Sequence, residues 1–221
     1  MSLSDLETRS LLLADVLSNQ RVGLRLARFL PKSNPIDCMV LRHGNLRDSP
    51  HSLGLWATEG ERCSLEKPLI QKRKTPTLER NELKAGDVLV PLTFGPFWAA
   101  CVPAGLTDRE GAEIPCFAYG GLMVLKPNPE LILPEYLTLW LRSESAADQV
   151  SRLSTDVSTD GVKRAITLKA SRLLSIAVPP LSVQAAVLQD YSRLIVQKQR
   201  IGDELNTIVA SHNPISKPGE S

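Results

Sequence analysis

The sequence is poor in the features that mark metal-binding, disulfide-rich or membrane proteins. Its four cysteines, Cys38, Cys63, Cys101 and Cys116, are widely spaced and include no CxxC pair, which favours buried, inert thiols. The three histidines are scattered, and no apolar run approaches the roughly 20 residues that span a bilayer. The acidic residues near the N-terminus do not suit a secretory signal. We therefore expect a cytoplasmic protein with no metal site and no membrane contact.

Excess positive charge and enzyme signatures are also lacking. Lys and Arg total 26 against 24 Asp and Glu, a net charge of +2, and a protein that binds DNA alone over a broad surface usually carries more. Any nucleic-acid contact should therefore be local, or shared with another subunit. The sequence has no HExxH or GxSxG motif, no DPPY-type methyltransferase tetrapeptide and no recognisable D-x(n)-ExK nuclease core. No Gly-rich phosphate loop follows a strand either, so we expect no catalytic site.

What the sequence does contain is a mixture of strand and helix signals over residues 1–180. Apolar segments predict strands at 37–41, at 88–90 after a turn at 85–87, and at 99–102, 115–119, 122–125 and 176–178. Helices are predicted over residues 6–17 behind the capping-box pattern of Ser4 to Glu7, over 134–142 behind Pro134, and over 145–153. This pattern indicates one compact α/β (α+β) domain with a mixed or antiparallel sheet.

The last part of the chain, residues 181–212, has the pattern of a long helix. Ser182 is placed to cap a helix that contains no proline, which predicts a rod of about 45 Å. Apolar residues recur along it with heptad spacing, and Lys198 is the one polar residue in the series: Val187, Tyr191, Leu194, Ile201, Leu205 and Ile208. The pattern favours a coiled-coil helix that pairs with another helix. The alternative is an amphipathic helix packed on its own domain, and residues 213–221 are expected to form a disordered tail.

Three segments, in this order, carry a resemblance to a known family. They are LKAGDVLV (83–90), VLKPNPELILPEYLTLWLRS (124–143) and LLSIAVPPLSVQAAVLQDYSRL (173–194). They are similar to a turn-and-strand motif, a strand-to-helix passage and the entry into a long helix in the specificity subunits of type I restriction–modification systems. The third segment departs from the family pattern, because Val183 stands where a Glu usually precedes the Gln and the proline motif is shortened.

The resemblance implies an architecture and a set of partners. Full-length members of the family carry two such target-recognition domains separated by two long helices that pack antiparallel, whereas this chain has one domain and one helix. It would thus be a half subunit that forms a homodimer through its C-terminal helix. The implied partners are double-stranded DNA, a DNA adenine methyltransferase subunit and, in some complexes, a restriction translocase. S-adenosylmethionine and ATP would belong to those partners, so no cofactor is expected on this chain.

The candidate DNA-reading residues are mostly cations and amides. The segment KPLIQKRKTPTLER (67–80) combines cations for phosphate with side chains that form bidentate bonds to base edges: Lys67, Gln71, Lys72, Arg73, Lys74, Thr75 and Arg80. A solvated basic loop is the alternative. Phe97 and Trp98 follow the 88–90 strand and suit a base methyl group or the backbone, although core aromatics are the more usual explanation. Weaker candidates are the pair Arg42-His43 and the pair Lys163 and Arg164, of which the second could equally contact phosphate or only water.

The sequence therefore supports one leading function and two alternatives. The leading interpretation is a non-catalytic subunit that selects a DNA sequence for a partner methyltransferase. The first alternative is a degenerate relative that acts as a protein-interaction adaptor without base readout, which the low net charge would allow. An uncharacterised nuclease or hydrolase is the second, because active sites can assemble from residues distant in sequence.

Overall fold

The computed structural model describes residues 7–24, 35–46, 61–66, 78–94, 99–105, 115–156 and 164–212. The strands in these ranges are β1 (Arg9–Leu12), β2 (Leu17–Val22), β3 (Pro35–Leu41), β4 (Glu61–Glu66), β5 (Val88–Pro91), β6 (Thr93–Phe94), β7 (Ala100–Cys101), β8 (Cys116–Ala118), β9 (Leu122–Pro127), β10 (Thr155–Asp156), β11 (Arg164–Ala165) and β12 (Ser175–Val178). The helices are α1 (Leu78–Asn81), α2 (Pro134–Leu141), α3 (Glu144–Leu153), α4 (Leu168–Ser171) and α5 (Leu181–His212), with 3-10 turns η2 (Leu13–Val16) and η4 (His43–Leu46).

A four-stranded antiparallel sheet in the order β2-β9-β5-β7 forms the centre of the domain. Both faces of β5 are buried, because its alternate side chains enter two different apolar clusters. Val88 and Val90 belong to one cluster, whereas Leu89 belongs to the other. The neighbouring strand β9 divides its side chains in the same way. Burial on both faces explains why residues 88–90 and 122–125 are continuously apolar rather than alternating.

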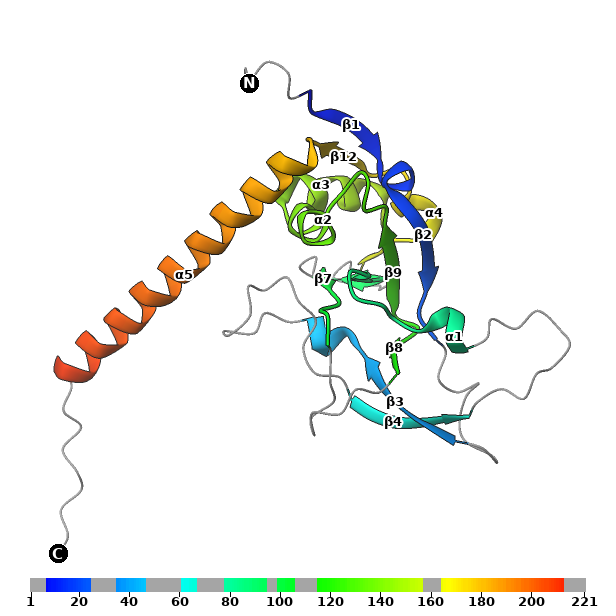
Figure 1. Ribbon diagram of the computed structural model, residues 1–221, viewed down its shortest axis with the longest axis horizontal. Helices are drawn as coiled ribbons and strands as arrows, with labels where there is room; N and C mark the ends of the chain where they lie inside the picture. The colour runs from blue at the N-terminus through cyan, green and yellow to red at the C-terminus, as the bar shows by residue number, and fades with distance from the viewer. Residues whose placement is uncertain are drawn as a thin grey trace, which may run out of the picture.

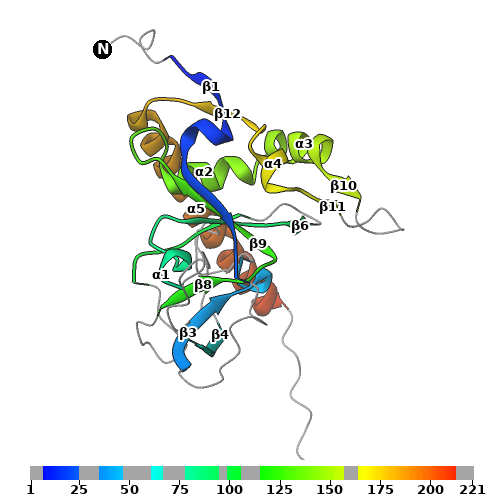
Figure 2. The ribbon, with the colours of Figure 1, turned by 90° about the vertical axis from the view of Figure 1, so that its right-hand side faces the viewer.

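Helices cover one face of this central sheet and a second sheet covers the other (Figures 1 and 2). Leu137 and Leu141 of α2 join Val150 of α3 in the helix-side cluster, while Met39 and Leu41 of β3 contribute to the other. The second sheet has the order β4-β3-β8, in which β3 is antiparallel to β4 and parallel to β8. The prediction of an α/β domain with a mixed sheet is confirmed.

The first described strand lies against the last one. β1 pairs antiparallel with β12, and the hydroxyl oxygens of Ser10 and Ser175 lie 2.8 Å apart although 165 residues separate them. The predicted helix over residues 6–17 is therefore wrong, because the described part of that segment forms β1, η2 and the first residue of β2. A distant pairing partner outweighs the local helical pattern here.

Most of the other predicted elements are present. Strands occur in each of the six predicted segments, and β9 continues to Pro127, two residues further than expected, where it still pairs with β2. α2 begins with Pro134 in its first turn, where a missing N–H leaves no intrahelical bond unmade. The Ser143 side chain caps α3 by accepting a hydrogen bond from the Ala146 amide. These local signals are typical of helix starts, which is why the sequence alone locates both helices.

The long helix α5 projects from the domain (Figure 1). It packs on α2 near its start. The carbonyl of Pro180 accepts hydrogen bonds from the amides of Val183 and Gln184 at 2.9 and 3.1 Å, so the helix begins at Leu181. The predicted cap at Ser182 is wrong, because this residue lies inside the first turn. Residues 213–221, the expected tail, lie outside the described residues.

Candidate nucleic-acid interface and pairing helix

The main predicted DNA-reading segment lies almost entirely outside the described residues. Lys67, Gln71, Lys72, Arg73, Lys74 and Thr75 belong to the undescribed range 67–77. Arg80 is described and is exposed on α1. That short helix is tied to the central sheet, because the Arg21 guanidinium of β2 donates hydrogen bonds from Nη2 to the Asn81 and Glu82 carbonyls at 2.9 and 3.2 Å. Arg80 thus extends from an anchored element at the C-terminal end of the predicted basic segment.

A small three-stranded sheet brings two of the other candidate segments together. β6 pairs with β11, and β11 pairs with β10, both antiparallel. In this register Arg164 lies opposite Phe94 on one side and opposite Asp156 on the other. β6 and β10 therefore run in the same direction. Phe97, Trp98 and Lys163 lie outside the described residues.

The sequence analysis gave no indication that β6 and β11 pair. Phe94 and Arg164 are 70 positions apart in the chain, and β6, β10 and β11 have only two residues each. Strands so short have no periodic signal. Their pairing is supported by the Ile166 amide, which donates to the Leu92 carbonyl at 3.0 Å next to the small sheet.

The turn in the segment 83–90 is held by a buried carboxylate. The Asp87 side chain is 4% exposed and accepts a hydrogen bond from the Lys84 amide at 3.0 Å, while Gly86 has a positive φ of 85° that suits glycine. Burial raises the pKa of Asp87, and the Lys84 amide and the nearby cations Lys126 and Arg21 oppose that rise. Lys126 Nζ lies 3.9 Å from the carboxylate. Asp87 therefore closes the turn and is not placed to contact DNA.

The described cysteines are buried, free thiols. Cys38, Cys101 and Cys116 are all buried without a disulfide, as the sequence predicts. Burial raises the pKa of both Cys101 and Cys116. The pKa of Cys116 is raised to about 12. In the described part of the chain, no group of three or more His, Cys, Asp or Glu side chains could hold a metal ion. No helix within these same ranges is long and apolar enough to cross a bilayer.

A fully buried glutamine joins α5 to the domain. Gln184 is 0% exposed, and its Oε1 accepts a hydrogen bond from the Leu133 amide at 2.8 Å. Its Nε2 donates to the carbonyls of Leu131 and Pro179 at 2.9 and 2.8 Å. One side chain thus links α5, the segment before α2 and the segment after β12. The sequence analysis recorded this glutamine only as part of a family motif and missed its role, since no local pattern reveals which polar helix residue faces inward.

Beyond this junction, the heptad residues of α5 are exposed. Val187 is 38% exposed, and Leu194, Ile201, Leu205 and Ile208 are each more than half exposed. Tyr191 is half-buried. The alternative of a helix packed along its own domain is therefore wrong for the described residues. We call Val187, Tyr191, Leu194, Ile201, Leu205 and Ile208, together with Lys198, the α5 seam.

The other faces of α5 carry local ion pairs. Arg193 and Asp190 lie 3.1 Å apart, and Arg200 and Glu204 lie 3.2 Å apart. Each exposed ion pair of this kind stabilises its helix by only a few tenths of a kcal/mol. Most of the exposed apolar side chains of the projecting helix belong to the α5 seam, and Val196, which is 63% exposed, lies outside it.

When the chain is compared with known proteins, the matches found are solved structures. No protein-family model matches the chain, and no curated protein sequence does. The fold is similar to that of the HsdS subunit from Thermoanaerobacter tengcongensis, with a TM-score of 0.53, 19% identity and an alignment that covers 97% of this chain and 51% of that one. It is also similar to a chain in a structure that describes complex assembly and conformational transition of the type I R–M system, with a TM-score of 0.60, 18% identity and the same coverages.

The comparison establishes a shared fold. The chain spans about half the length of both matched chains, and nearly all of it takes part in each alignment. The chain thus shares the fold of about half the length of an HsdS subunit. The resemblance that three sequence segments indicated is therefore confirmed for the fold. The sequence identities are below one fifth, so the comparison concerns the fold alone.

Proposed function

We propose that this chain is a DNA-recognition subunit that directs a DNA adenine methyltransferase to its target site and contributes no catalysis of its own. The observation that carries the proposal is the fold shared with half of an HsdS subunit over 97% of the chain. The exposed α5 seam supports it, because this seam offers an apolar surface through which a second helix can join. In this proposal S-adenosylmethionine and ATP are bound by partner subunits, and a restriction translocase is a further partner.

The pairing partner that we propose for α5 is a second copy of the chain. In heptad terms Tyr191, Lys198 and Leu205 occupy a positions, and Leu194 and Ile201 occupy d positions. A parallel, in-register pair would place both Lys198 ammonium groups in one layer, since a residues then face each other. In an antiparallel pair a faces d, so Lys198 lies against Leu194 or Ile201 of the other copy. Two like charges in one layer repel each other, which favours the antiparallel pair.

The proposal is tested first by whether an adenine methyltransferase gene lies beside this one, and then by co-expressing the two products in a host that lacks adenine methylation. Sequencing that detects N6-methyladenine should find methylation at one short sequence only when both proteins are present. The chain alone, supplied with S-adenosylmethionine, ATP and Mg²⁺, should show neither methyl transfer nor DNA cleavage. A stable complex that methylates no defined sequence would favour the adaptor alternative. Turnover by the chain alone that one point substitution in it abolishes would show an enzyme instead.

A further inference from the structure

The parallel pair β3 and β8 places two side chains of complementary chemistry at one edge of the second sheet. Parallel strands end at the same edge, and in this register Leu41 lies opposite Ala118 at the last paired position. The next residues of the two strands are Arg42 and Tyr119. The Arg42 guanidinium carbon lies 5.4 Å from the centroid of the Tyr119 ring, within the range of a cation–π contact. We call these two residues the Arg42–Tyr119 pair.

The backbone of Tyr119 is fixed by three neighbouring segments. Its amide donates to the Leu41 carbonyl at 2.9 Å, its carbonyl accepts from the Leu122 amide at 2.9 Å, and it forms a β-bridge with Leu24. Gly23 permits this close approach, because a Cβ atom there would lie 2.2 Å from the Tyr119 carbonyl oxygen. The ring is thus carried by a rigid backbone although the side chain itself is 41% exposed.

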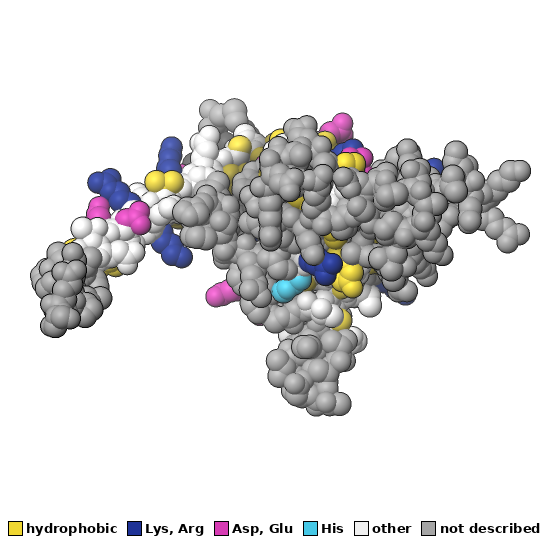
Figure 3. Space-filling view, turned by 90° about the horizontal axis from the view of Figure 1, so that it is seen from below, with side chains coloured by type: hydrophobic (Ala, Val, Ile, Leu, Met, Phe, Trp, Pro, Cys, Tyr) yellow, Lys and Arg dark blue, Asp and Glu magenta, His cyan; other side chains and the backbone are white. Residues whose placement is uncertain are grey.

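The pair lies on the surface of the molecule. Arg42 and the following His43 are exposed, while Leu41 and Ala118 directly beneath are buried. Figure 3 shows a histidine beside Lys or Arg atoms and apolar atoms on the face seen from below. A guanidinium held over an aromatic ring loses less side-chain entropy when it binds an oxyanion than a freely rotating one would. Arg and Tyr are both among the side chains that contact DNA phosphates.

We propose that the Arg42–Tyr119 pair contacts the sugar–phosphate backbone of duplex DNA, Arg42 as the charged donor and Tyr119 as the group that positions it. The inference rests on the proposed function, and it assigns that function a contact outside the basic segment 67–80. A stacked cation on a rigid edge would fix the register of the domain on the duplex, whereas base readout would fall to other residues.

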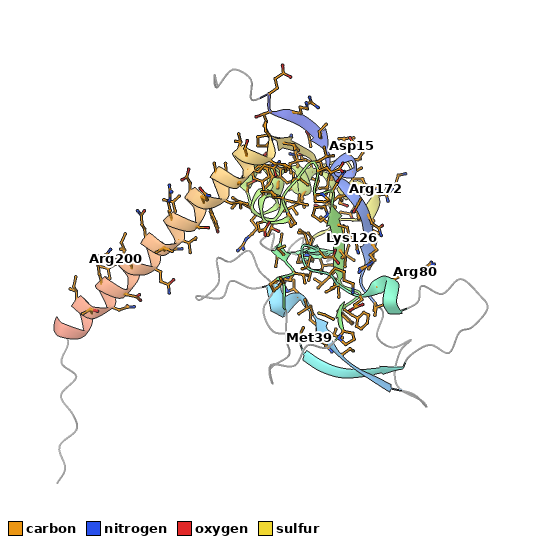
Figure 4. All side chains as sticks on the ribbon, in the orientation of Figure 1. Asp15, Met39, Arg80, Lys126, Arg172 and Arg200 are labelled. Carbon is orange, nitrogen blue, oxygen red and sulfur yellow. The ribbon has the colours of Figure 1, made fainter. Side chains whose placement is uncertain are left out.

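The test is salt-dependent binding of the full chain to a fluorescent DNA duplex of mixed sequence, followed by anisotropy. Arg42→Ala should weaken binding roughly three- to tenfold at low salt and lower the slope of log K against log salt by about one unit. Arg42→Lys should keep the slope, because the charge remains. Tyr119→Leu should weaken binding with the slope unchanged. The matched control is Arg172→Ala, an exposed arginine that donates to Gln20 and lies near α4, well away from Met39 of β3 (Figure 4).

Three results would overturn the inference. Equal affinities and slopes for the wild type, Arg42→Ala and Tyr119→Leu would do so while leaving the proposed function intact. An equal loss in the Arg172→Ala control would show a diffuse charge effect without a site. A wild type that binds no duplex even at the lowest salt would also remove the inference, and the methylation assay would then decide the proposed function separately. Circular dichroism of each variant shows whether the fold is kept, and Arg42→Gln, which also removes the charge, provides the test if Arg42→Ala unfolds.

Discussion

Replacing Gln184 by Leu should destabilise the protein and loosen α5 from the domain. The side chain is fully buried and makes three neutral hydrogen bonds, to the Leu133 amide and to the Leu131 and Pro179 carbonyls. Each such bond contributes about 1 kcal/mol, and a buried amide left without a partner costs about 1–3 kcal/mol more. We therefore expect a loss of about 3–5 kcal/mol, a large fraction of the roughly 5–15 kcal/mol that stabilises a typical domain.

Urea denaturation followed by circular dichroism measures this loss. The control is Gln189→Leu, which changes an exposed glutamine on the same helix and should shift the free energy of unfolding by less than about 0.5 kcal/mol. Gln184→Glu should also be destabilising, because it keeps an acceptor for the Leu133 amide but turns a carboxylate oxygen toward two carbonyl oxygens. If Gln184→Leu unfolds at the same urea concentration as the control, the reasoning on this junction is wrong.

The other predictions concern association, pH and thiol reactivity. Asp at both Ile201 and Leu205 should lower the mass measured by light scattering to that of one chain with the domain still folded; an unchanged mass would show that the α5 seam does not pair. Burial raises the pKa of Asp87, so its protonated form stabilises the fold in acid, and that stability is lost as pH rises through the raised pKa. Asp87→Asn should make the temperature of thermal unfolding depend less on pH. Asp87→Ala should lower the free energy of unfolding by about 1–2 kcal/mol, because the turn hydrogen bond is lost. Iodoacetamide near neutral pH should label Cys101 and Cys116 only after unfolding, because burial raises both thiol pKa values; rapid labelling of the folded chain would contradict their burial.

The parts of the fold that the sequence predicted are those with strong local signals. The turn before β5 contains Gly86 at a positive φ followed by Asp87, and both features are visible in the residue types alone. α5 is long and free of proline, so its pattern persists over enough turns to identify it. The predicted helix over 6–17 failed because β1 is fixed by β12, and no local pattern reports a partner so far along the chain.

The candidate site was harder to predict for the same reason. Arg164 and Phe94 come together only through the register of two-residue strands, which carry no periodic signal. Arg42 and Tyr119 meet because two parallel strands end at one edge, and their separation in the sequence conceals this. The inward orientation of Gln184 likewise depends on how α5 crosses the domain. Side chains that act in pairs across elements need the tertiary arrangement to be recognised.

The pairing of β1 with β12 has a consequence for the order in which the protein forms during synthesis. Residues 9–12 leave the ribosome early but remain without their partner until residues 175–178 have been made. Domains generally fold as units during translation, and contacts between distant residues form late. The domain is therefore completed only when the start of α5 is about to emerge, because α5 follows β12 after two prolines. Each nascent chain should accordingly finish its own domain before its helix is long enough to meet another, which protects the assembling subunits from exchanging strands.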